Sequence, residues 1–133
     1  MEIKNKISIL GFHLTNLVFI IFYLYPGSIF GCYLYNNCYI QPEITGNFII
    51  SSNYWVSSNH FYIFIILSAV GIFSHHNVSR VKFLIIYLFL LSIILEVLHL
   101  IIPNRGFEWA DLFGNILGVL LVIIIYKLKN KYV

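Results

Sequence analysis

Ionisable and amide side chains interrupt two long apolar segments in the C-terminal half of the chain. Glu96 and His99 lie three residues apart, so a helix would place them on one face. Asp111 and Asn115 lie four residues apart and would share a face of the next helix. Carboxylate and imidazole groups can transfer protons or bind a polar ligand. Because an ionised group costs about 2.5–3.5 kcal/mol at mid-membrane, such groups usually face a bundle interior or a wet cavity.

The connection between these two segments is short, which predicts two neighbouring antiparallel helices. At a rise of about 1.5 Å per residue, the first polar pair lies about 6 and 10 Å deep and the second about 5 and 10 Å deep. Arg105 lies in the connection and can fold back over both pairs. The pattern therefore predicts a polar pocket that opens to the outer face, with Arg105 at its mouth. The alternative is structural: Arg105 pairs with Asp111 or Glu96 and only stabilises a tight hairpin.

Two further pairs of residues have spacings that suggest a role. Gly114 and Gly118 form a G-x-x-x-G pair, which allows close approach of a neighbouring helix or of a second copy in a homo-oligomer. Cys32 and Cys38 are the only cysteines. They would form a disulfide in an oxidising compartment and otherwise remain two unpaired thiols.

The composition indicates that a membrane surrounds these residues. Of the 133 residues, 60% are hydrophobic and 10% are charged, whereas a soluble domain has about 25% charged residues. Lipid can solvate so apolar a surface and water cannot. The scattered cations form no basic face, which argues against nucleic-acid binding. A chain of this length is expected to form a single domain, residues 1–133.

Four apolar segments are long enough to be membrane-spanning helices, since a span needs about 20 such residues. We expect the spans at residues 7–25, 56–74, 81–102 and 109–126, with an outer loop at 26–55 that lies partly along the membrane surface. The backbone polar groups of a segment in lipid must be satisfied internally, so each span must be helical. The expected fold is all-α: an antiparallel bundle of four transmembrane helices.

The basic residues predict the orientation of this bundle. Seven of the 8 Lys and Arg residues precede the first span, separate the second from the third or follow the fourth. Only Arg105 falls on the other side. Because basic residues accumulate in cytoplasmic loops, both ends of the chain are expected in the cytoplasm.

The polar stretch resembles the VanZ-like family of small bacterial membrane proteins. The family pattern is a Glu in a span, a polar residue (usually Gln) three positions later, Pro-x-Arg, an aromatic residue, and then Asp, Asn and Gly. These positions are here Glu96, His99, Pro103, Arg105, Phe107, Asp111, Asn115 and Gly118. His99 departs from the usual Gln. The family also tends to have a Lys and a His at the start of the second span, of which Asn59-His60 keeps the His.

This resemblance implies a multi-pass protein of the bacterial cytoplasmic membrane, with an envelope role such as low-level resistance to teicoplanin-type glycopeptides. It directs attention to Glu96, His99, Arg105, Asp111, Asn115 and His60 as pocket residues. We expect binding of a lipid-linked or cell-wall ligand by a non-enzymatic protein. The alternative is a small membrane enzyme that acts on a lipid-linked precursor or a lipid headgroup. In that alternative Glu96 and Asp111 would act as general acid and base, or would hold a metal together with His99 and His60. No recognised metal-ligand spacing is present, so no metal is expected, and no other cofactor is expected either.

Overall fold

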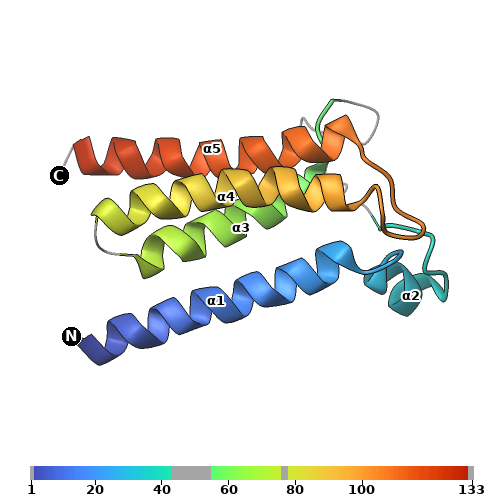
Figure 1. Cartoon of the computed structure of the whole chain (residues 1–133), viewed down its shortest axis with the longest axis horizontal. Coiled ribbons are helices and arrows are strands. Elements are labelled where there is room, and N and C mark those ends of the chain that lie inside the picture. The colour runs from blue at the N-terminus through green and yellow to red at the C-terminus, as the bar shows by residue number, and fades with distance from the viewer. Residues whose placement is uncertain (1, 43–54, 76–77, 132–133) are drawn as a thin grey trace.

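The computed structural model describes residues 2–42, 55–75 and 78–131, and these residues form helices and connections without a strand. The helices are α1 (Glu2–Leu24), α2 (Ile29–Tyr35), α3 (Ser58–Ser74), α4 (Val78–Leu98) and α5 (Trp109–Lys131). Figure 1 shows α3, α4 and α5 side by side, with α1 along one flank of this group and α2 at the C-terminal end of α1. Helix α1 begins and α5 ends at the same end of the bundle.

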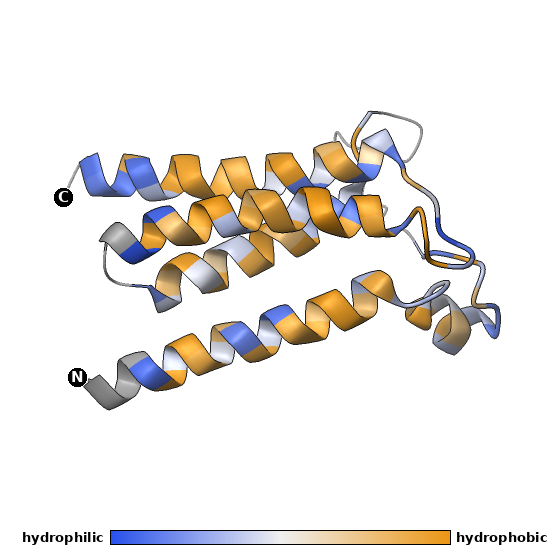
Figure 2. Cartoon of the chain, in the orientation of Figure 1, coloured by the Kyte–Doolittle hydropathy of each residue, from blue (hydrophilic) through white to orange (hydrophobic). Residues whose placement is uncertain are grey.

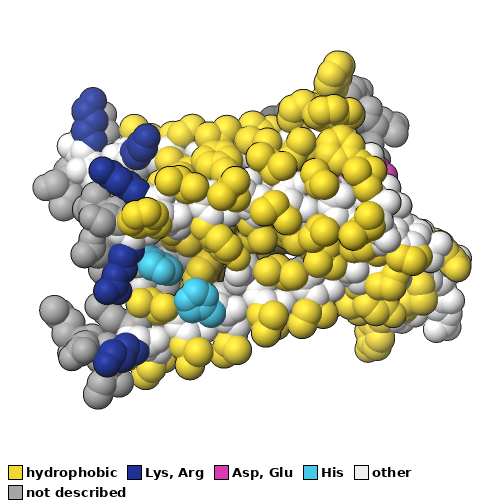
Figure 3. All heavy atoms as spheres, viewed as in Figure 1, with side chains coloured by type: hydrophobic (Ala, Val, Ile, Leu, Met, Phe, Trp, Pro, Cys, Tyr) yellow, Lys and Arg dark blue, Asp and Glu magenta, His cyan; other side chains and the backbone are white. Residues whose placement is uncertain are grey.

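Three of these helices are long and apolar enough to cross a membrane. These candidate spans are Lys6–Leu24, Arg80–Leu98 and Trp109–Lys131. Helix α3 is also apolar but has only 17 residues, or about 26 Å at 1.5 Å per residue. The helices are apolar along their length (Figure 2), and basic side chains gather at the end where α1 begins (Figure 3). The arrangement is that of an all-helical membrane protein.

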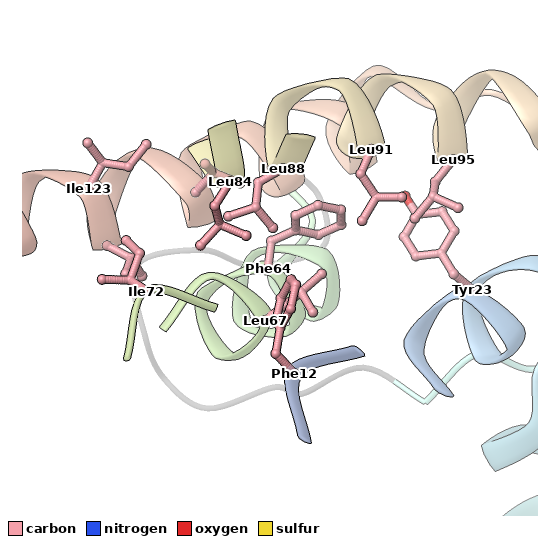
Figure 4. Packing of buried hydrophobic residues seen from close by; sticks show 12 residues of the cluster. Phe12, Tyr23, Phe64, Leu67, Ile72, Leu84, Leu88, Leu91, Leu95 and Ile123 are labelled. Atoms are coloured by element: carbon pink, nitrogen blue, oxygen red, sulfur yellow. The ribbon is translucent and has the colours of Figure 1, made fainter. Parts of the chain in front are cut away.

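The core lies where α1 and α4 meet α3 and α5. Phe64, Leu88 and Val119 are at most 1% exposed and come from three different helices. Figure 4 shows Phe12 and Tyr23 of α1 reaching toward this cluster. Most other apolar side chains of α1 point outward, as expected where lipid is the solvent. Helix α1 therefore joins the bundle through few side chains.

Helices α3 and α5 pack backbone against backbone. A Cβ atom added at Gly114 would lie 2.6 Å from the carbonyl oxygen of Ser57, and one at Gly118 would lie 2.6 Å from that of Phe61. The Ser57 N–H also donates a hydrogen bond to the Ala110 carbonyl at 2.9 Å. The glycine pair thus allows close packing within one chain, so these positions are not available to a second copy.

Several helix ends differ from those expected, and the end of the third span has a clear physical reason. The third apolar segment was predicted to continue to residue 102, but α4 ends at Leu98. Three tighter turns follow, in which the N–H groups of His99, Leu100 and Ile101 each bond a carbonyl three residues back. Such turns give the last carbonyl groups of the helix a hydrogen-bond partner. The helix cannot simply run on, because Pro103 has no N–H to donate.

The predicted outer loop contains α2, a short helix. The Ser28 hydroxyl caps it by accepting a hydrogen bond from the Gly31 N–H at 3.0 Å, and Asn36 ends it in the left-handed region at φ 49°. A disulfide joins Cys32 to Cys38, whose Cα atoms lie 4.1 Å apart. Residues 43–54 of this loop lie outside the described part of the chain.

Candidate functional site

A tyrosine of α1 occupies the centre of the polar cluster. The Tyr23 hydroxyl donates to Glu96 Oε2 at 2.9 Å and accepts a hydrogen bond from Asn115 Nδ2 at 2.7 Å. The same oxygen lies 2.9 Å from His60 Nδ1. Tyr23 therefore connects α1 with side chains from α3, α4 and α5.

Two further groups hold the Glu96 carboxylate. Its Oε1 accepts a hydrogen bond from the Glu108 N–H at 2.8 Å, and its Oε2 lies 3.5 Å from His99 Nδ1. The other ring nitrogen of His99, Nε2, lies 3.0 Å from the Tyr23 carbonyl oxygen. The His99 ring also stacks on that of Tyr23, with ring centroids 4.7 Å apart. Glu96 is completely buried, so these contacts replace the water that a carboxylate would otherwise bind.

His60 connects this cluster with Asp111. Its Nε2 lies 3.3 Å from Asp111 Oδ2, and its Nδ1 lies 3.3 Å from Asn115 Oδ1. The Asn115 amide also donates to the Ser92 carbonyl at 3.4 Å, which fixes the orientation of the amide. We refer to Tyr23, His60, Glu96, His99, Asp111 and Asn115 as the polar network.

A cavity of about 600 Å³ lies beside the network, bounded by α1, α2 and the start of α3. Its wall is mostly apolar, with side chains such as Phe19, Phe22 and Ile63. Tyr23 and His60 are the members of the network that reach this wall. The cavity is large enough for a small amphiphile.

Arg105 reaches the same cavity but stays away from the carboxylates. Its Nη1 donates to Gln41 Oε1 at 3.2 Å and its Nε to the Tyr25 carbonyl at 3.4 Å. No ion pair joins it to an acidic side chain within the ranges 2–42, 55–75 and 78–131. The guanidinium is thus a cation beside an apolar cavity whose described wall contains no carboxylate.

The structure brings five of the six predicted pocket residues together. His60, Glu96, His99, Asp111 and Asn115 meet in the network, whereas Arg105 lies apart from it at the cavity. Glu96, His99 and Asn115 are at most 1% exposed and all contact Tyr23 rather than an open pocket. The cavity that Arg105 lines therefore lies beside the network, and only Tyr23 and His60 of the network reach its wall.

Sequence reasoning missed Tyr23, the side chain with the most partners in the network. The chain has 10 tyrosines, and one at the end of an apolar segment is typical of the membrane–water interface. Only the packing of α1 against the other helices selects it.

His60, Glu96 and Asp111 each offer an atom that can bind a metal ion, and these three atoms lie within 4.8 Å of one another.

The fold and the site define an all-helical membrane protein with a buried polar network at the end where α1 and α4 end and α5 begins. The VanZ/LLP1 family model matches residues 10–130 of the chain. This match covers most of α1, all of α3 and α4, nearly all of α5 and every network residue, and the chain belongs to the VanZ/LLP1 family. No curated protein and no solved structure matches it.

Proposed function

We propose that this VanZ-like protein crosses the bacterial cytoplasmic membrane four times, with both ends in the cytoplasm. Helix α3 would be the fourth crossing segment, since its 17 residues nearly match a hydrocarbon core of about 30 Å. The described basic residues other than Arg105 lie at the opposite end of the bundle, as the positive-inside rule requires for a cytoplasmic end. Arg105, the disulfide and the cavity would then face outward.

We propose further that the cavity binds a lipid-linked or cell-wall ligand of the envelope. The observation that carries this proposal is the juxtaposition of Arg105 with an apolar cavity of about 600 Å³. An arginine binds phosphate or carboxylate well through its planar array of donors, while an acyl or prenyl chain would contact side chains such as Phe22 and Ile63. The exposed apolar face of α1 would let such a ligand enter from the bilayer.

In this proposal, the cell-level effect is lower susceptibility to teicoplanin-type glycopeptides. Family membership supports an envelope role, and the outward cavity supplies a means to change access of an antibiotic to lipid-linked targets. Loss of ligand binding, rather than loss of turnover, would then abolish protection. No covalent chemistry is needed.

The test is teicoplanin susceptibility in a sensitive Gram-positive host. The arms are empty vector, wild type, Arg105→Ala and the control Lys129→Ala, with membrane levels matched. Lys129 is an exposed cation at the other end of the bundle. We expect wild type and Lys129→Ala to protect and Arg105→Ala to fail. Equal susceptibility of wild type and empty vector would show that the resistance role does not apply to this protein.

One observation favours a second function, that of a small enzyme acting on an envelope lipid. His60 faces both the cavity and Asp111, and a His–Asp pair can act as a general base. The discriminating measurement is the lipid extract of cells that carry wild type or His60→Gln. A lipid that changes chemically only with wild type indicates an enzyme, and identical extracts favour binding alone.

A further inference from the structure

We propose that His60, Glu96 and Asp111 bind a divalent transition-metal ion, for which Zn²⁺ is the natural candidate. The three residues come from α3, α4 and α5, and one ligand atom of each lies within 4.8 Å of the others. Histidine nitrogen and carboxylate oxygen are both ordinary ligands of Zn²⁺. The inference concerns the network itself and does not depend on which ligand the cavity takes.

The hydrogen bonds around His60 place no hydrogen between its ring and Asp111. Its Nδ1 faces Asn115 Oδ1, which only accepts, and the Tyr23 hydroxyl, whose proton goes to Glu96. The Nδ1 atom must therefore carry the hydrogen, and a neutral ring then presents the Nε2 lone pair. Opposite that lone pair, 3.3 Å away, is Asp111 Oδ2. Two acceptors face each other, so a proton or a cation must lie between them.

The charges of the network also favour a bound cation. Glu96 and Asp111 are two carboxylates in a largely buried site, and their described ion-pair partners are histidines alone. Arg105 bonds Gln41 and the Tyr25 carbonyl instead. Buried charges are normally paired or bound to a metal, and a single divalent ion would balance both carboxylates.

The distances suit such an ion after a modest closure of the site. Metal bonds of about 2.0–2.2 Å at tetrahedral angles separate neighbouring ligand atoms by about 3.3–3.6 Å. The Nε2–Oδ2 distance of 3.3 Å already falls within this range. The Glu96 carboxylate lies within 4.8 Å of the other two ligand atoms and would have to move closer to them. Since His60 lines the cavity, the remaining coordination position would be open to water or to a ligand oxygen.

The experiment measures metal content of the purified, detergent-solubilised chain, isolated without a polyhistidine tag. The protein is treated with chelator, equilibrated with Zn²⁺, desalted and analysed by mass spectrometry for metal and protein. We expect about one Zn²⁺ per chain for wild type and for the control His13→Gln, because His13 is an exposed residue outside the network. The isosteric variant Asp111→Asn and the variant His60→Gln should bind Zn²⁺ at least about tenfold more weakly.

A second measurement covers the case in which the variants misfold. Wild type alone is loaded with Co²⁺, whose visible absorption is intense in a tetrahedral site and weak in an octahedral one. Intense absorption that Zn²⁺ displaces supports the proposal. A wild-type chain that retains no metal would overturn it and show that protons join the histidines to the carboxylates. Equal metal content in wild type and the two network variants, with helical circular dichroism intact, would also overturn it.

Discussion

Tyr23 shows how much of the polar network depends on one hydroxyl group. It is the shared hydrogen-bond partner of His60 in α3, Glu96 in α4 and Asn115 in α5. Removal of the hydroxyl would leave three buried polar groups each without one partner. An unsatisfied buried group costs about 1–3 kcal/mol, so this one atom should contribute to the attachment of α1.

We expect Tyr23→Phe to lower the free energy of unfolding by about 1–3 kcal/mol, because the aromatic packing remains and only the hydrogen bonds are lost. The measurement is reversible unfolding in mixed detergent micelles. Tyr25→Phe is the matched control, since Tyr25 is 38% exposed and no described hydrogen bond uses its hydroxyl. Equal stability of the two variants would mean that the Tyr23 hydroxyl does not hold the network together.

The contact between α3 and α5 depends on two glycines one helical turn apart. The added Cβ atom at Gly118 would meet the backbone oxygen of Phe61 at 2.6 Å and the Phe64 side chain at 2.9 Å. A backbone atom cannot rotate away as a side chain can, so the helices would have to separate. That separation would also move His60 relative to Asp111 and thus disturb the network.

Gly118→Ala should therefore destabilise the protein by about 1–3 kcal/mol, the usual cost of overpacking a core. The control is Gly11→Ala in α1, where an added Cβ meets nothing within 4 Å and helix propensity favours alanine. Thermal unfolding in detergent compares the two variants with wild type. If both variants unfold at the same temperature, the close approach of α3 and α5 does not limit the stability of the protein.

The placement of charges over the whole molecule leads to a prediction about topology. Arg105 lies in the connection between α4 and α5, and Lys127, Lys129 and Lys131 lie at the far end of α5. Because basic residues are retained on the cytoplasmic side, the two ends of α5 should face different compartments. Single cysteines introduced at these ends can report which compartment each one faces.

In a background without Cys32 and Cys38, Asn104→Cys should react with a membrane-impermeant maleimide on intact cells. Lys129→Cys should react only after the cells are permeabilised. Labelling is read as a gel shift, with total cysteine counted after denaturation as the control for expression. The opposite pattern would place the cavity and Arg105 on the cytoplasmic side and remove the basis for an outward ligand site.

The sequence by itself determined the features that depend on local order along the chain. Long apolar segments specify helices in lipid, because backbone groups there have no other partners. The positions of basic residues predict an orientation, and the polar stretch from Glu96 to Gly118 indicates the family that the comparison then showed. The pairs Glu96–His99 and Asp111–Asn115 were predicted to meet, because helix periodicity and a short connection constrain them.

Only the tertiary structure decided what these residues contact. Tyr23 enters the network because α1 packs against the end of α4, and no spacing along the chain encodes that contact. Arg105 bonds Gln41 and the Tyr25 carbonyl, and helix periodicity does not predict contacts with residues so far away along the chain. The tight packing of α3 against α5 seals Asn115 and Glu96 inside. The open polar pocket expected from periodicity is thus a closed network beside an apolar cavity, because contacts between helices, and not positions on one helix, determine which faces are buried.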